Sequence, residues 1–269
     1  MFTIRMMKPI YQLTDNLHFF DRRWPILYVD NHLFAVYKPS GLLVQGDHTG
    51  DISLLALGKR WIKTRYHKPG RVFLALVHRL DRPVAGVVLF ARTTKAAGRL
   101  ARQFRERTVQ KHYLAVVHGR VPKRPAKLIH HILRNQRQSR VVAAPTMNSQ
   151  EARLNYTVLD RSKHKSLLQV KLETGRRHQI RIQLAHIGHP ILGDLRYGAG
   201  EPIGKKQIAL LAHILSVDHP TQETRLAIQS PLPVGWPWPT EKSADRRTAP
   251  WDWRVFGETV RCVARIPDD

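Results

Sequence analysis

The sequence contains few cysteines and few acidic residues for its length. Cys262 is the only cysteine in 269 residues, so the chain can form no internal disulfide and no zinc site built from several thiolates. Asp and Glu total 20 against 45 Lys and Arg, which gives a formal net charge of +25. Basic residues recur along the chain, and phosphate contacts release condensed counterions. The surplus therefore favours a nucleic acid partner over a basic surface that is only solvated.

Long apolar runs are also absent. The longest, around residues 84–91, is far too short to span a bilayer. Arg5 and Lys8 lie near the N-terminus, but no continuous apolar stretch follows them as it would in a secretory signal. Asp15 and Asp21 argue against a mitochondrial presequence. We therefore expect a cytoplasmic protein that has no membrane partner.

Metal and nucleotide motifs are missing too. The 15 histidines include close pairs at 130–131 and at 186 and 189, but no third ligand of suitable type and spacing accompanies either pair. Residues 198–200, Gly-Ala-Gly, lack the Lys and the Ser or Thr that follow in a phosphate-binding loop. The sequence therefore predicts no bound metal and no nucleotide cofactor.

The residue pattern predicts many short strands and three helices. Residues 26–30 and 33–38 are β-prone runs around the turn-forming pair Asp30-Asn31, which indicates a hairpin. Residues 94–107 carry their apolar side chains on one face, and Thr94 can cap them, which indicates a helix. The other strands are expected at 72–80, 86–92, 112–121, 153–160, 166–173, 208–218 and 225–229, and the other helices at 52–66 and 177–187.

The order of these elements favours an α+β fold. Residues 122–150 are basic and polar and contain three prolines, so they are expected to form an irregular excursion. Strands and helices do not alternate regularly, which indicates a mixed, mainly antiparallel β-sheet with flanking helices. We expect one folded body at 24–233, an N-terminal extension at 1–23, and a Pro- and Trp-rich C-terminal extension at 234–269.

The segment 77–83, Val-His-Arg-Leu-Asp-Arg-Pro, is the most informative for chemistry. Asp81 leaves an apolar run at a turn and has Arg79 and Arg82 beside it in the sequence. Neighbouring cations lower the pKa of a carboxyl group and keep it ionised, so it can act as a nucleophile or base. The spacing alone equally suits a structural ion pair at the end of a strand.

Four segments, taken in order, resemble the motifs of the RluA-type pseudouridine synthases, which are RsuA/RluA-like. The resemblance covers about residues 24–233 and implies that they form a catalytic domain of the pseudouridine synthase fold, with a central cleft. The segments are 31–43, with Lys38-Pro39-Ser40-Gly41; His78-Arg79-Leu80-Asp81, followed by Ala85-Gly86; Gln110-Lys111-His112-Tyr113-Leu114-Ala115; and 173–194, with Gly175-Arg176-Arg177-His178-Gln179-Ile180-Arg181.

The resemblance implies an isomerase that converts specific uridines of structured rRNA or tRNA to pseudouridine. The base detaches from C1′, rotates and rejoins through C5, so the reaction needs no cofactor. We expect the enzyme to act as a monomer.

The resemblance assigns catalytic roles to three residues. Asp81 matches the catalytic aspartate, which acts on C1′ or on the proton at C2′, and the sequence leaves both routes open. Tyr113 matches a tyrosine that stacks on the target base and helps to remove the C5 proton. Arg181 matches a basic residue that keeps the aspartate ionised in a water-poor pocket. Taken alone, Tyr113 suits a half-buried strand residue and Arg181 a solvated helix face.

Further residues are expected to contact RNA. Arg79 matches an arginine that fills the space left by the flipped base, a role that suits a planar guanidinium. The exposed arginines of the 94–107 helix and the basic stretch 120–140 are candidates for phosphate contacts, which position RNA without reading its sequence. The other residues predicted to serve RNA binding and base flipping are Arg82, Arg176 and His178.

One departure from the motif lies beside the catalytic aspartate. Val84-Ala85 occupies positions where the family usually has Thr-Ser, which removes two hydroxyl groups near Asp81. Two other functions stay open. An RNA-binding protein without activity would not need to retain Asp81, Tyr113 and Arg181 together. A nuclease or DNA-binding protein would need metal-binding carboxylates or a helix-turn-helix, and the sequence shows neither.

Overall fold

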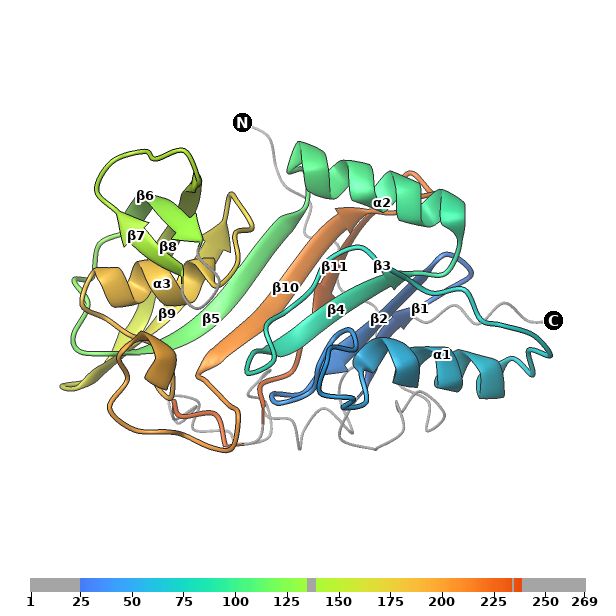
Figure 1. The fold of residues 1–269 in the computed structure, drawn as a ribbon, viewed down its shortest axis with the longest axis horizontal. Coiled ribbons are helices and arrows are strands. Elements are labelled where there is room, and N and C mark those ends of the chain that lie inside the picture. The colour runs from blue at the N-terminus through green and yellow to red at the C-terminus, as the bar shows by residue number, and fades with distance from the viewer. Residues whose placement is uncertain (1–24, 135–138, 234, 239–269) are drawn as a thin grey trace.

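The computed structural model describes residues 25–134, 139–233 and 235–238, and Figure 1 shows them as a broad β-sheet with helices packed on it. The predicted extension at 1–23 and residues 239–269 of the predicted C-terminal extension lie outside this part of the chain. Within the described part, no helix is long and apolar enough to cross a membrane.

Eleven strands of the described ranges form one sheet. They are β1 (Ile26–Val29), β2 (Leu33–Lys38), β3 (Ala75–Leu76), β4 (Ala85–Ala91), β5 (Gln110–His118), β6 (Ala126–Arg134), β7 (Ser139–Val142), β8 (Ser149–Arg161), β9 (Lys165–Leu172), β10 (Leu210–Asp218) and β11 (Arg225–Gln229). The strand order is β1-β2-β4-β10-β5-β9-β8-β6-β7, with β11 paired to β10 and β3 to β4. The pairing is antiparallel except between β4 and β10. This confirms the predicted mixed, mainly antiparallel sheet.

In the part of the chain that the structure describes, three α-helices flank this sheet. They are α1 (Leu54–Arg65), α2 (Thr94–Glu106) and α3 (Gln179–His186), and a 3₁₀ helix, η2 (Leu195–Tyr197), follows α3. The predicted helices at 52–66, 94–107 and 177–187 are therefore confirmed. The cap predicted at Thr94 is wrong by one residue, because the hydroxyl of Thr93 accepts the hydrogen bond from the Ala96 amide at 3.2 Å. Thr93 has the extended backbone that an N-cap needs, whereas Thr94 is already helical.

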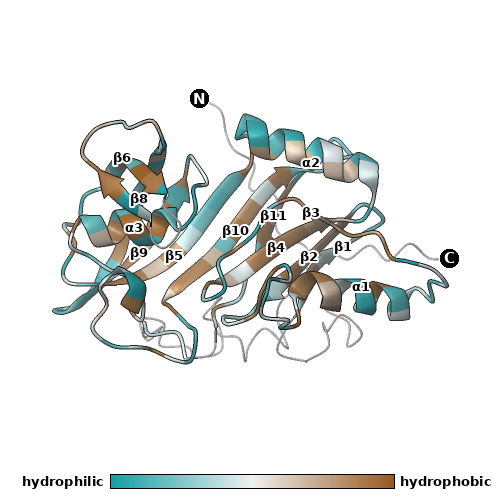
Figure 2. Ribbon diagram, in the orientation of Figure 1, coloured by the Kyte–Doolittle hydropathy of each residue, from teal (hydrophilic) through white to brown (hydrophobic). Residues whose placement is uncertain are grey.

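The sheet is buried on both faces because its central strands are apolar on both sides. All seven residues of β4 are buried, and Figure 2 shows this strand as largely hydrophobic. Alternate residues of a strand point to opposite faces. Phe34 of β2 therefore packs in one core with residues of α1 and α3, and Ala35 packs in a second core with residues of α2.

The irregular excursion predicted at 122–150 is wrong. β6 and β7 form an antiparallel hairpin there, and β6 also pairs with β8. Leu128 of β6 packs against the main core and Ile132 is buried, whereas the apolar Ile129 is 53% exposed. Apolar residues of β6 stand in adjacent pairs in a basic segment, so the sequence lacks the alternation that marks a half-buried strand.

The beginning of the C-terminal extension packs on the folded body. Trp238 is buried against the main core, and Trp236 packs beside it. Lys165 donates a hydrogen bond to the Pro237 carbonyl at 2.6 Å, and its ammonium lies 5.4 Å from the Trp238 ring centre. Residues 236–238 therefore belong to the body that was expected to end at 233.

The strand predicted at 72–80 is wrong in extent, because only Ala75–Leu76 pairs with β4. His78 takes the next position on that edge, where its Nε2 accepts a hydrogen bond from the Leu89 amide at 2.9 Å. Burial lowers the pKa of His78 to about 3, so the ring is neutral at pH 7 and keeps a lone pair for this bond. A side chain thus satisfies an amide that a strand would otherwise satisfy, and the following residues leave the sheet.

One edge of β4 is shared between two strands. β2 pairs with β4 along the opposite edge. On the shared edge, β3 pairs at residues 90–91 and β10 pairs at residues 85–86. In the chain, residues 77–83 connect β3 to the beginning of β4, where β10 pairs. The loop that carries Asp81 therefore projects from the middle of the sheet rather than from its rim.

Gly86 allows β4 and β10 to approach closely. Its φ is +127°, a conformation that side chains disfavour, and an added Cβ would lie 2.2 Å from the carbonyl oxygen of Ala212. That oxygen belongs to the backbone of a central strand and cannot move aside easily. The parallel pairing beside the Asp81 loop therefore depends on the absence of a side chain at this position.

Gly86→Ala should lower the free energy of unfolding by about 3 kcal/mol or more, because the methyl group adds both backbone strain and overlap. Urea denaturation of the purified protein measures this. Gly98→Ala is the matched control: Gly98 lies within α2 with open space where its Cβ would be, so alanine should stabilise the protein by about 0.5 to 1 kcal/mol. Similar changes in both variants would contradict the close approach at Gly86.

Candidate active site

A cationic groove opens over the middle of the sheet. Its volume is about 1130 Å³, and its walls come from the 77–84 loop, the end of α2, the beginning of β5 and the turn before α3. Among the described residues, three carboxylates line it, those of Asp47, Asp81 and Glu173. Ten cationic side chains of the same part of the chain also line it: Arg79, Arg82, Arg105, Arg107, Lys111, Arg134, Arg176, Arg177, Arg181 and Arg196.

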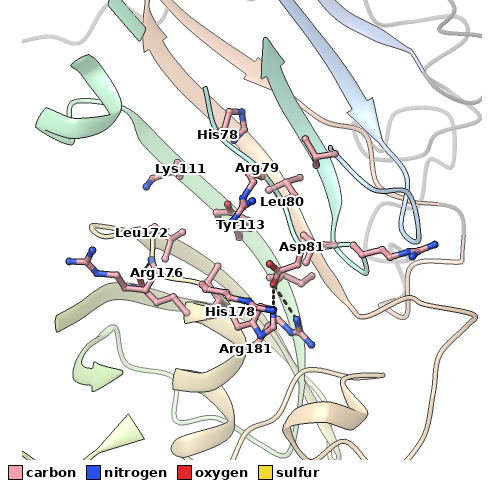
Figure 3. A pocket seen from close by; sticks show the side chains of 18 of the residues that line it. His78, Arg79, Leu80, Asp81, Lys111, Tyr113, Leu172, Arg176, His178 and Arg181 are labelled. Carbon is pink, nitrogen blue, oxygen red and sulfur yellow. Dashed lines mark hydrogen bonds and ion pairs between the residues drawn. The ribbon is translucent and has the colours of Figure 1, made fainter. Parts of the chain in front are cut away.

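Asp81 lies where two elements distant in sequence meet (Figure 3). Its Oδ2 accepts a hydrogen bond from Nη1 of Arg181 at 3.1 Å and lies 3.5 Å from Nε2 of His178. The Asp81 side chain is 27% exposed, so it is open to the groove on one side and contacts Arg181 on the other. The structure thus brings together Asp81 and Arg181, as predicted from the sequence.

Arg181 is a buried cation on α3 with a full set of partners. Its Nε and Nη2 donate to the two carboxylate oxygens of Asp194 at 2.7 and 2.8 Å, and its Nη1 reaches Asp81. Its guanidinium carbon lies 5.0 Å from the centre of the Tyr197 ring. Burial lowers the pKa of Arg181, but the hydrogen bonds and charges of Asp194 and Asp81 outweigh burial and raise it. The cation is therefore permanent.

His178 is the other neighbour of Asp81. Its backbone has a φ of +56° at the start of α3, and its Nδ1 lies 2.7 Å from the Tyr197 hydroxyl. Burial lowers the pKa of His178 to about 4, with a further lowering from nearby arginines that the charge of Asp81 only partly offsets. The ring is therefore neutral at pH 7. When Nδ1 accepts from Tyr197, Nε2 carries the proton and points it toward Asp81.

Tyr113 lines the groove from β5, paired with Val170 on one side and Ala212 on the other. Burial, and then the charge of Asp81, raise the pKa of Tyr113, so the phenol stays protonated at neutral pH. Its hydroxyl has no hydrogen-bond partner within the described part of the chain. Figure 3 shows the ring beside Arg79 and above Asp81.

The residues predicted to contact RNA differ in how they are held. Arg79 is exposed and lines the groove, without a carboxylate partner in the described ranges. Arg82 is engaged by the protein itself, since its Nε donates to the Gly41 carbonyl at 2.9 Å and its guanidinium pairs with Asp51. The Nε of Arg176 donates to the Glu151 carbonyl at 3.0 Å.

Sequence reasoning missed a buried ammonium beneath the Asp81 loop. Lys38, at the end of β2, is fully buried and donates to the carbonyls of Pro39, Leu42 and Arg82 at 2.9, 2.8 and 3.1 Å. Burial lowers the pKa of Lys38 to about 7, although the charge of Asp81 acts in the opposite direction. Lys38 ends an otherwise apolar strand and opens the quoted Lys38-Pro39-Ser40-Gly41 segment, but neither feature predicts a buried ammonium.

Asp194 and Tyr197 were also missed. They follow α3 and hold Arg181 and His178, respectively, in place. Asp194 was part of the quoted motif, but no pattern of spacing pairs a carboxylate with an arginine 13 positions before it.

The Val84-Ala85 departure has a packing consequence. Both side chains are buried, Val84 in the core beneath α1 and Ala85 in the core beneath α2. These positions contribute apolar contacts behind the loop, where hydroxyl groups would each need a hydrogen-bond partner.

The described residues contain no group of three or more His, Cys, Asp or Glu side chains arranged to hold a metal ion. The rings of His130 and His186 do meet edge to face, with centroids 4.9 Å apart. The third group at this contact is the Gln183 amide, whose nitrogen lies 3.1 Å from Nδ1 of His130. The pair is therefore part of a hydrogen-bonded cluster between α3 and β6.

Both sequence and fold resemble known proteins. Residues 32–186 match the family described as RNA pseudouridylate synthase. The chain is 36% identical over 216 residues to ribosomal large subunit pseudouridine synthase C of Vibrio cholerae, and 36% identical over 222 residues to ribosomal large subunit pseudouridine synthase D of Nitrosomonas europaea. Each match covers 77% of this chain but only 65% and 62% of those proteins, so the chain spans less than two thirds of their length.

A solved structure shares the fold. Human RNA pseudouridylate synthase domain containing 4 superposes with a TM-score of 0.66 over 78% of this chain and 89% of that chain, at 24% sequence identity.

Asp194→Asn should lower the free energy of unfolding by about 3 kcal/mol, because a buried guanidinium loses its bidentate anionic partner. Chemical denaturation measures the change. Asp218→Asn serves as the control, since Asp218 is exposed and pairs with the exposed Arg225 at 2.7 Å, where the loss should stay below about 1 kcal/mol. Equal losses in the two variants would show that Arg181 does not depend on Asp194.

Proposed function

The chain belongs to the RNA pseudouridylate synthase family, and on that basis we propose that it isomerises specific uridines to pseudouridine in RNA of the large ribosomal subunit. One observation carries the proposal. Asp81 is open to a strongly cationic groove, while its other side is fixed by a buried arginine that Asp194 holds with two hydrogen bonds. Such a site can present a fixed carboxylate to a polyanionic substrate.

The proposed catalytic carboxylate is that of Asp81. A flipped uridine would enter the groove with its ribose against this group, and Arg181 would keep the carboxylate ionised after water has left. The carboxylate then either attacks C1′ or removes the C2′ proton to give a glycal, and in both routes the C1′–N1 bond breaks and the base leaves as a uracil anion. The base rotates and bonds to C1′ through C5, which releases the carboxylate in the first route and returns the proton to C2′ in the second. Loss of the C5 proton completes either route. Neutral His178, 3.5 Å away, is suited to orient Asp81 without competing for its charge.

Tyr113 would act on the flipped base, and Arg79 would act on the RNA stack that the base leaves. The protonated phenol of Tyr113 has no hydrogen-bond partner among the described residues, so it is free to stack on the uracil and to assist proton removal at C5. Arg79 is exposed at the rim, where its planar guanidinium is suited to fill the vacated stack. We also assign RNA binding to Arg176 and His178, and to Arg82 a part in shaping the loop through Gly41.

The proposed substrate is rRNA, and the proposed location is the cytoplasm. The relatives from Vibrio cholerae and Nitrosomonas europaea are named for the large ribosomal subunit, which favours rRNA over tRNA. Residues 24–233 would form the catalytic domain, acting as a cytoplasmic monomer. No cofactor is required, since the reaction rearranges bonds within one nucleotide.

Asp81→Asn should reduce turnover by about 100-fold or more, because the amide can neither attack nor accept a proton. Carbodiimide-based pseudouridine mapping compares rRNA from cells with and without the gene. A site that disappears on deletion should return with the wild type and with Asp218→Asn, an exposed control outside the groove, but not with Asp81→Asn. If no site changes and the purified protein converts no uridine in deletion-strain RNA, an RNA-binding protein without activity explains the chain better.

Arg79→Ala should slow single-turnover conversion by about tenfold or more and change RNA affinity much less, because flipping costs a few kcal/mol that the arginine would offset. The defect should shrink on a substrate in which the target uridine is mispaired and already unstacked. A uniform loss of affinity for all RNA sequences would instead make Arg79 a phosphate contact.

A further inference from the structure

Lys111 lies at the groove wall next to Tyr113. Both residues are on β5 and are two positions apart, so their side chains point to the same face of the sheet. The strand rise separates them by roughly 7 Å, which is the scale of one nucleotide. Figure 3 shows both side chains at the groove, with Lys111 farther from Asp81 than Tyr113 is.

No carboxylate balances the charge of Lys111. Within the described ranges, neither Lys111 nor Arg107 has an acidic side chain within ion-pair distance. Lys111 and Arg107 line the same groove, and burial, and then the charge of Arg107, lower the pKa of Lys111. The three groove carboxylates are engaged elsewhere: Asp81 with Arg181, Glu173 with Lys127 and Asp47 with Thr49.

The opposite wall leaves room for the ammonium. A Cβ added to Gly175, in the turn before α3, would lie 3.4 Å from Nζ of Lys111. The ammonium therefore lies against the backbone of that turn, and β5, which carries Lys111, forms the other wall. A half-buried cation at a narrow place, next to a second cation and without an anion of its own, is suited to bind an anion supplied by a ligand.

We propose that Lys111, assisted by Arg107, binds a backbone phosphate of the RNA next to the target nucleotide. This inference rests on the proposed function, because it takes the base at Tyr113 as the reference point. The phosphate would fix the strand one nucleotide from the reacting carbon and so hold the ribose against Asp81. Lys111 is then a positioning residue that acts through the substrate backbone.

The first test compares Lys111→Gln with Lys111→Arg on rRNA from a strain that lacks the gene. We expect Lys111→Gln to raise KM about tenfold with a smaller change in kcat, as for the loss of one charged hydrogen bond. The slope of log affinity against log salt should fall by about 0.7, the value for one phosphate of a single strand. Lys111→Arg should restore both. Lys63→Gln, which removes the same charge from the exposed face of α1, should change neither.

A second test needs no variant and therefore does not depend on folding of Lys111→Gln. Lysines of the wild-type protein are acetylated with acetic anhydride, with and without the same rRNA, and quantified by mass spectrometry. We expect RNA to protect Lys111 several-fold and to leave Lys63 unchanged.

Two results would overturn the phosphate site: equal behaviour of Lys111→Gln and Lys63→Gln in both KM and salt slope, or acetylation of Lys111 that RNA does not alter. Absence of any conversion by the wild type would instead contradict the proposed function. The salt slope and the protection would still decide the phosphate site, so the two failures are distinguishable.

Discussion

The buried charge of Arg181 constrains the whole site. A guanidinium removed from water is stable only when anions meet it in good geometry, and here Asp194 supplies two hydrogen bonds and Asp81 a third. Asp194 reaches the guanidinium because the chain turns back beside α3. Asp81 reaches it because residues 77–83 leave the sheet next to Arg181. One cation thus sets the relative positions of the Asp81 loop, α3 and the segment that follows α3, although the loop lies 100 positions from Arg181 in the chain.

Apart from Arg181, the side chains next to Asp81 include neutral ones although the groove is cationic. Burial keeps His178 uncharged by lowering its pKa to about 4 and keeps Tyr113 protonated by raising its pKa. His78, behind the loop, is neutral for the same reason and serves as a hydrogen-bond acceptor. The carboxylate therefore has neutral groups beside it as well as the permanent cation of Arg181, while the other cations line the rest of the groove. In the proposed function, the neutral groups would serve proton transfer and the cations would attract the phosphate backbone.

Short-range patterns in the sequence predicted most elements, and the failures have identifiable causes. The hairpin at 26–38 was predictable because its turn residues lie between two apolar runs. The strand at 72–80 was overextended, because the sequence does not show that His78 would satisfy an amide of β4 with its side chain. The hairpin of β6 and β7 was missed because the segment is basic and the apolar residues of β6 stand in adjacent pairs instead of alternating with polar ones. The contact between Asp81 and Arg181 spans 100 positions and was accessible only through the family resemblance.

The imbalance of charge in the groove affects the stability of the free protein. Ten cations converge there against three carboxylates, and like charges held together oppose the compact state. The apolar cores on both faces of the sheet must offset that repulsion in the free protein. In the proposed function, bound RNA would reduce this repulsion, because a ligand that binds only the folded form stabilises that form. The nucleic acid would then act as a structural counterion as well as a substrate.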